Sequence, residues 1–167
     1  MKFDTRDIAL TAVFAALYAV LVVALTGISF QIVQVRVADA LIPLSMVFGW
    51  PVMVGVTVGG AIANFASPMP SILTDVTFGS IANFIASMLA WKIGKLKVGN
   101  AIRDFLGCTA ATATVTFIVG TYLAILTAME LWIWWLGIGI GSIISINILG
   151  YALVQILKRT LTKPDAT

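Results

Sequence analysis

Two long stretches without any charge constrain what this chain can fold into. Residues 8–35 contain no charged side chain, and neither do residues 40–74. An apolar stretch of about 20 residues is long enough to cross the hydrocarbon core of a membrane as a helix. The chain of 167 residues is 60% hydrophobic and 10% charged, with a mean hydropathy of +1.07. The sequence therefore predicts an all-α integral membrane protein.

The apolar runs and the breaks between them predict six helices within a single transmembrane domain, residues 1–167. Pro51 and the two prolines of the Ser67–Ser71 segment interrupt helical structure, because proline lacks a backbone N–H and its ring clashes with the preceding turn. The expected helices cover about residues 8–28, 37–49, 52–66, 74–92, 105–127 and 131–157.

The distribution of charge predicts how the bundle is oriented. Lys and Arg concentrate on the cytoplasmic side of membrane proteins. With six crossings and both termini inside, every Lys and Arg except Arg36 falls on that side. The outer connections then hold Arg36, Asp39, Asp75 and Glu130. We therefore expect a multi-pass plasma-membrane protein with cytoplasmic termini and an outward-facing site where the three outer junctions meet.

Polar residues at or near these junctions are the candidate substrate-binding residues. Ionisable groups within a membrane are energetically costly, so by default they indicate function. A carboxylate accepts two parallel N–H groups, a guanidinium donates to a carbonyl, and a side-chain amide does both. Such a set suits a small, flat, polar solute. The candidates are Gln34, Arg36, Asp39, Asn64, Asp75, Asn83 and Glu130.

Simpler structural roles remain open for several of these residues. Arg36 and Asp39 are three positions apart and can pair across a helical turn. Asp75 and Glu130 each stand at an expected helix start, where a carboxylate stabilises the helix N-terminus. Asn83 can hydrogen-bond to a neighbouring helix and hold the bundle together.

Small side chains on the first helix form a candidate docking face for a partner protein. Ala12 and Ala16 are four residues apart, as are Ala15 and Ala19. This small-xxx-small spacing lets helices approach closely in lipid. Packing inside the same protein uses the same spacing, so both interpretations remain open.

Signatures of enzymes are missing from the sequence. There is no histidine, which removes the commonest general base and metal ligand. Cys108 is the one cysteine, so no internal disulfide can form. No phosphate-binding glycine loop occurs. We expect a protein that is not an enzyme and holds neither metal nor cofactor, with any ATP hydrolysis in separate subunits.

Two motifs resemble the substrate-binding S components of energy-coupling-factor (ECF) transporters, and in particular the QueT family of queuosine-precursor transporters. Members carry a stretch like I-Q-F-R-V-S-E-A-L after the first helix and a later D-x-x-F-G-S segment. The counterparts here are VQVRVADAL at residues 33–41 and DVTFGS at residues 75–80. Glu130 also looks similar. Asp39 stands where the family has Glu, and Val35 replaces an aromatic residue.

The resemblance implies a six-transmembrane-helix bundle of ECF S-component type that captures a queuosine precursor on the outer side. The solute would be a 7-deazaguanine such as 7-aminomethyl- or 7-cyano-7-deazaguanine. The implied partners are a transmembrane coupling protein, docked on the alanine face, and two cytoplasmic ATPase subunits. The alternatives are an S component for a different vitamin or small flat solute, and a non-transporting membrane scaffold subunit.

Overall fold

The structure, a computed structural model, describes residues 4–161 and is helical wherever this range has regular structure. Helices satisfy their own backbone hydrogen bonds, which a chain in lipid requires. Four helices are long and apolar enough to cross a membrane: α1 (Thr5–Ala24), α5 (Ile72–Ile93), α6 (Asn100–Thr127) and the continuous run Leu131–Leu161. Two shorter apolar helices cover Val37–Phe48 and Trp50–Asn64. The prediction of an all-α membrane protein agrees with this architecture.

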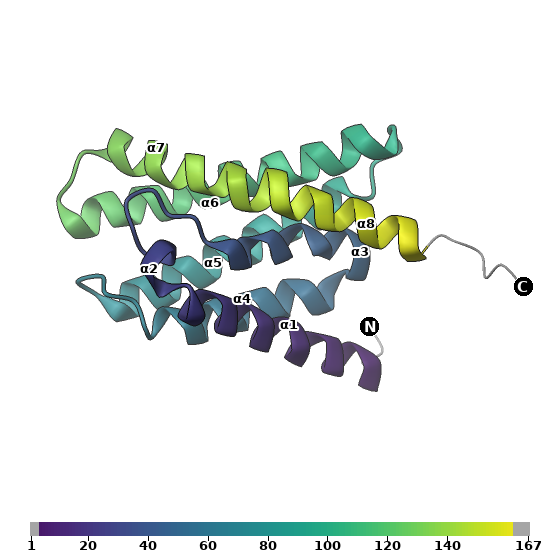
Figure 1. Cartoon of the computed structure of the whole chain (residues 1–167), viewed down its shortest axis with the longest axis horizontal. Coiled ribbons are helices and arrows are strands. Elements are labelled where there is room, and N and C mark those ends of the chain that lie inside the picture. Colours follow the sequence, from purple (N-terminus) through teal and green to yellow (C-terminus); the bar gives the residue numbers. More distant parts are fainter. Residues whose placement is uncertain (1–3, 162–167) are drawn as a thin grey trace, which may run out of the picture.

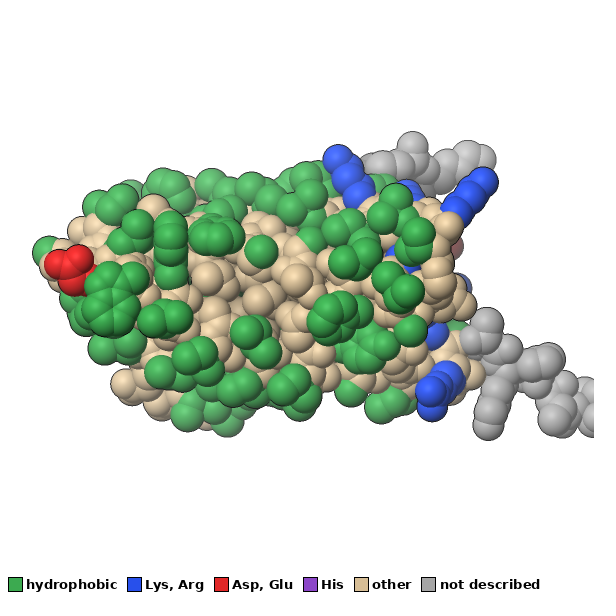
Figure 2. Space-filling model, turned by 90° about the horizontal axis from the view of Figure 1, so that it is seen from above, with side chains coloured by type: hydrophobic (Ala, Val, Ile, Leu, Met, Phe, Trp, Pro, Cys, Tyr) green, Lys and Arg blue, Asp and Glu red, His purple; other side chains and the backbone are tan. Residues whose placement is uncertain are grey.

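The helices lie side by side along the long axis of the molecule (Figure 1). α4 (Trp50–Asn64) packs between α1 and α5, and α6 packs between α5 and α7 (Leu131–Ser142). The start of α1 and the end of α8 (Tyr151–Leu161) lie at the same end of the bundle (Figure 1). Lys and Arg side chains gather at that end, whereas an acidic group marks the opposite one (Figure 2).

The second expected helix, over 37–49, is not one regular α-helix. It consists of a 3₁₀-helix, η1 (Val37–Leu44), followed by a single α-helical turn, α3 (Ser45–Phe48). Pro43 lies inside η1 and cannot donate a backbone hydrogen bond. Gly49 then adopts φ +74°, which favours glycine, and Pro51 occupies the first turn of α4.

The first and last expected helices also differ in detail from the structure. α1 ends at Ala24 and is followed by a short helix, α2 (Thr26–Ser29). The long C-terminal helix contains a π-helical stretch, η2 (Ile143–Gly150), before α8 (Tyr151–Leu161). η1 packs against η2, and the Pro43 ring lies against Gly150, where the absence of a side chain leaves room for it.

The fifth expected helix begins at Asn100 rather than near Phe105. Asp104, expected in a polar linker, is instead buried within α6. Its Oδ1 accepts hydrogen bonds from Lys158 Nζ at 2.7 Å and Arg103 Nε at 3.1 Å, and its Oδ2 accepts one from Gln155 Nε2 at 3.0 Å. These contacts pair a carboxylate that would otherwise be buried alone, and they tie the start of α6 to α8.

Candidate substrate-binding site

A carboxylate and a guanidinium are buried in the same part of the bundle interior. Arg36 and Asp39 are each 5% exposed. Asp39 lies in the first turn of η1, and Arg36 immediately precedes that helix. From α1, the Tyr18 hydroxyl donates to Asp39 Oδ1 at 2.5 Å. Within residues 4–161 the ion pairs all belong to Asp104, so Arg36 and Asp39 do not pair across the turn.

The Arg36 guanidinium retains unused hydrogen-bonding capacity. Its Cζ lies 5.2 Å from the centre of the Phe30 ring, and its buried Nε has no hydrogen-bond partner. The guanidinium lines the same small cavity as Asp39. Leaving a buried donor without an acceptor is costly. The arrangement therefore provides a donor for a carbonyl or similar acceptor on a solute.

A second buried carboxylate, Asp75, lies at the start of α5 and is 1% exposed. From α6, the Tyr122 hydroxyl donates to its Oδ1, and its Oδ2 has no partner. From the end of α4, Asn64 Nδ2 donates to the Asp75 backbone oxygen at 2.9 Å. The helix cap is Ser71, whose Oγ accepts from the Thr74 backbone N–H. Capping therefore does not explain why Asp75 is buried.

The two remaining amides support this group from different sides. Asn83 Nδ2, on α5, donates to the Val56 backbone oxygen of α4 at 3.0 Å, so this residue does join two helices. Gln34 Nε2 donates to the Ser29 backbone oxygen at 2.5 Å, and its Oε1 has no partner. Gln34 thus braces the loop that leads into η1 while leaving one acceptor unused.

Four of the candidate residues line one small cavity. Its polar wall is Gln34, Arg36, Asp39 and Asn83, and its apolar wall includes Val115, Val119 and Ile138, beside Ser142. The cavity volume is about 10 Å³, close to the minimum for one water molecule. A site for a small organic molecule needs about 300 Å³ or more. A solute therefore enters only if a neighbouring segment moves.

Two of the residues that line the cavity, Gln34 and Arg36, belong to the loop of residues 30–36. Its backbone lies directly on α7, where Gly137 faces the Ile32 oxygen and Gly141 faces the Gln34 oxygen. A Cβ at either glycine would overlap these backbone atoms. The two glycines, four residues apart on one helix face, form a seat for the loop.

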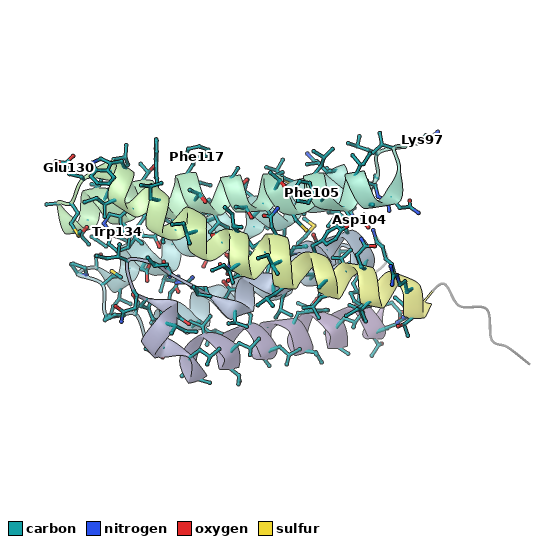
Figure 3. The ribbon with its side chains drawn as sticks, turned by 45° about the horizontal axis from the view of Figure 1, so that its top comes forward. Lys97, Asp104, Phe105, Phe117, Glu130 and Trp134 are labelled. Atoms are coloured by element: carbon teal, nitrogen blue, oxygen red, sulfur yellow. The ribbon has the colours of Figure 1, made fainter. Side chains whose placement is uncertain are left out.

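Glu130 does not join the buried group. It is exposed and immediately precedes α7, and Figure 3 shows it at the tip between α6 and α7. α6 ends at Thr127, and the residue that follows, Ala128, has a left-handed φ of 54°. Trp134 is buried, and its Nε1 donates to Thr127 Oγ1 at 2.8 Å across this turn. The backbone therefore directs Glu130 outward. Asp39 and Asp75 are thus buried in the bundle, whereas Glu130 is not.

Tyr18 and Tyr122 are functional candidates that the sequence analysis did not select. Each donates a hydrogen bond to one of the two buried carboxylates. The chain has three tyrosines, and these two lie within apolar helices. A buried tyrosine hydroxyl usually requires a partner, so a tyrosine in a membrane span was itself a signal.

The alanine face of α1 is divided by the packing. Ala15 is buried against α4, where there is no room for a side chain at Gly59. Ala12 and Ala16 are exposed, and Ala19 is half-buried. Packing within the chain thus accounts for Ala15, while three alanines remain accessible to a partner.

Together, the helical fold and its long apolar helices define a multi-pass membrane protein with a buried polar group inside the bundle. The family model described as QueT transporter matches residues 8–159. The chain belongs to the QueT transporter family, as its two motifs indicated. This family is one of transporters, which implies a small-molecule substrate and a multi-pass membrane protein. No curated protein and no solved structure matches the chain.

Proposed function

We propose that the chain is the substrate-binding S component of an ECF-type uptake transporter, with six crossings, and that it captures a queuosine precursor of the 7-deazaguanine class. The observation that carries the proposal is that Arg36 and Asp39 are buried side by side without forming a salt bridge to each other. Both are charged, lie inside a membrane bundle and line the same cavity. Their partners within the described chain leave the Arg36 Nε–H free to donate.

The chemistry of the cavity wall matches a guanine-like ring. Such a ring presents two adjacent N–H groups, which the carboxylate of Asp39 accepts, and a carbonyl, which accepts from Arg36. The Tyr18 hydroxyl fixes one oxygen of Asp39 and so orients the carboxylate. Val115, Val119 and Ile138 provide apolar contact for the faces of the ring.

Capture requires the cavity to open, and the 30–36 loop is the element we expect to move. The loop carries Gln34 and ends with Arg36. Movement of the loop away from Gly137 and Gly141 would therefore widen the cavity and displace these two recognition residues. Its return would enclose the solute. The chain itself needs only the energy of binding for this step.

The two ends of the bundle fit opposite environments. The end that gathers Lys and Arg (Figure 2) fits the cytoplasm, which also places both termini there. Asp39 and Asp75 would then lie toward the outer side. We propose that a transmembrane coupling protein docks on Ala12, Ala16 and Ala19, and that two ATPase subunits supply the energy for reorientation and release.

The proposal is tested by calorimetric titration of the detergent-purified full chain with 7-aminomethyl-7-deazaguanine, 7-cyano-7-deazaguanine and guanine. We expect binding of a deazaguanine and a loss of affinity of about 10- to 100-fold in Asp39→Asn, because a charge-assisted hydrogen-bond pair is removed. Glu130→Gln is the matched control, since it removes an exposed carboxylate outside the site. Thermal unfolding of both variants checks that they are folded.

Other outcomes point to other functions. Binding that survives Asp39→Asn unchanged would contradict the assigned clamp. Failure of all three compounds to bind, with binding of another flat solute, would identify an S component for a different substrate. A folded chain that binds none of the solutes tested would favour the scaffold alternative.

A further inference from the structure

Two buried side-chain oxygens, on residues that are hydrogen-bonded to each other through other atoms, have no donor. Asp75 is 1% exposed and Asn64 is 0% exposed, and neither Asp75 Oδ2 nor Asn64 Oδ1 has a hydrogen-bond partner. Both side chains are held in place by their other atoms. The Tyr122 hydroxyl occupies Asp75 Oδ1, and Asn64 Nδ2 is bound to the Asp75 backbone oxygen. The two free oxygens can only accept.

Packing keeps this pair together. Gly79 lies one turn after Asp75 on α5, and a Cβ there would overlap Asn64 Nδ2 and lie 3.7 Å from the Tyr122 hydroxyl oxygen. Glycine at this position therefore makes room for the amide and the hydroxyl that hold Asp75. The acceptor pair is built by three helices, α4, α5 and α6, rather than by one flexible side chain.

The charges of the buried group do not balance. Asp39 and Asp75 are two buried carboxylates without an ion pair, whereas Arg36 is the one Lys or Arg side chain that is buried among residues 4–161. An unmatched negative charge in a membrane interior is costly. A second cation would remove that cost. A primary ammonium carries three N–H donors and no acceptor, which is the complement of the two free oxygens.

We infer that Asp75 and Asn64 form a subsite for a protonated primary amine on the transported solute, next to the ring site of Arg36 and Asp39. The inference rests on the proposed function. No group of three or more potential metal ligands occurs among the residues that the structure describes, and the pair offers too few oxygens for a divalent ion. A neutral solute whose nearest group only accepts hydrogen bonds would meet two acceptors and be rejected.

Two compounds with the same ring separate this subsite from the ring site. The 7-aminomethyl compound carries an ammonium, whereas the 7-cyano compound carries a neutral acceptor. By calorimetry on the full chain, we expect the wild type to bind the aminomethyl compound about 10- to 100-fold more tightly. In Asp75→Asn the aminomethyl affinity should fall by a similar factor, while the cyano affinity stays the same or rises, because the new amide donates.

Glu130→Gln is the control for long-range attraction, since it removes one exposed negative charge outside the buried group; it should leave the ratio of the two affinities unchanged. If Asp75→Asn does not fold, Asn64→Ala, which removes the second acceptor, should still lower the ratio several-fold. Equal affinities in the wild type would overturn the amine subsite and leave the proposed function standing. An equal loss of affinity for both compounds in the variants would have the same meaning. Failure of both compounds to bind the wild type would overturn the proposed function and the subsite together.

Discussion

Replacing Gly141 by Ala tests whether the seat on α7 holds the 30–36 loop. The added Cβ would overlap the backbone oxygen of Gln34 and lie 3.1 Å from the Val35 backbone nitrogen. No change of rotamer relieves a clash between backbone atoms and a Cβ. Gly139→Ala is the matched control, because its Cβ would make only ordinary contacts, with Thr116 Cγ2 at 3.5 Å and Thr116 Oγ1 at 3.7 Å.

The expected magnitude follows from two opposing effects. Overpacking a well-packed site costs about 1–3 kcal/mol, and the clash of backbone atoms places Gly141→Ala at the upper end. Alanine recovers about 1 kcal/mol of helix propensity relative to glycine. The net loss is therefore about 2 kcal/mol, which lowers Tm by about 4–8 °C for a chain of this size. Gly139→Ala gains the propensity alone, so its Tm should rise by about 2–4 °C.

The same variants report on ligand capture. If the loop encloses the solute when it is packed on α7, destabilising this closed conformation by about 2 kcal/mol weakens binding by up to about 30-fold. Stopped-flow tryptophan fluorescence of the detergent-purified chain would measure this as faster dissociation, with Gly139→Ala indistinguishable from the wild type. If Gly141→Ala matches Gly139→Ala in both Tm and dissociation rate, the loop does not depend on this seat and the reasoning is refuted.

Two further predictions concern the opposite end of the bundle and the surface of α1. Lys158→Met removes the 2.7 Å contact to buried Asp104 and should lower the free energy of unfolding by about 1–3 kcal/mol. The control is Arg159→Met, at the exposed neighbouring position. It should change the free energy of unfolding by less than about 0.5 kcal/mol in the same thermal unfolding assay. A larger effect of Arg159→Met would show that net charge, rather than the Asp104 contact, sets stability there. Ala16→Leu should abolish copurification of the coupling protein while ligand binding persists, whereas Ala15→Leu, buried against α4, should lower Tm instead. Retention of the partner by folded Ala16→Leu would remove the docking role from this face.

Much of the site could be predicted because charge is so rare in this sequence. Arg36 and Asp39 stand out between two uncharged stretches, and the cost of burying them in a membrane made a functional role the natural interpretation. Asp75 carried the same signal. The structure buries all three residues, and Arg36 and Asp39 line one cavity. The helical class followed equally directly, since long apolar runs leave few other ways to satisfy the backbone in lipid.

What escaped prediction depends on contacts between distant residues or on single backbone angles. The roles of Tyr18 and Tyr122 require partners 21 and 47 positions away, which no local pattern encodes. The outward position of Glu130 depends on the left-handed φ of Ala128. Alanine rarely adopts this conformation, so the sequence does not predict it. The early start of α6 depends on the pairing of Asp104 with Lys158, 54 positions away.

The loop seat and the charge imbalance bear on the same step. Seating the 30–36 loop removes Arg36 and Asp39 from water, and the cost of enclosing Asp39 and Asp75 with one guanidinium is highest when the loop is closed. A solute that brings its own positive charge lowers that cost only if it is enclosed. Binding of the cationic solute therefore stabilises the closed loop, and a neutral analogue with the same ring stabilises it less. A ligand that binds one state stabilises that state by an amount that grows with its concentration relative to Kd. The cationic compound should therefore raise the Tm of the wild type more than that of Gly141→Ala at equal saturation, because only in the wild type does binding also recover the full contact between the loop and α7.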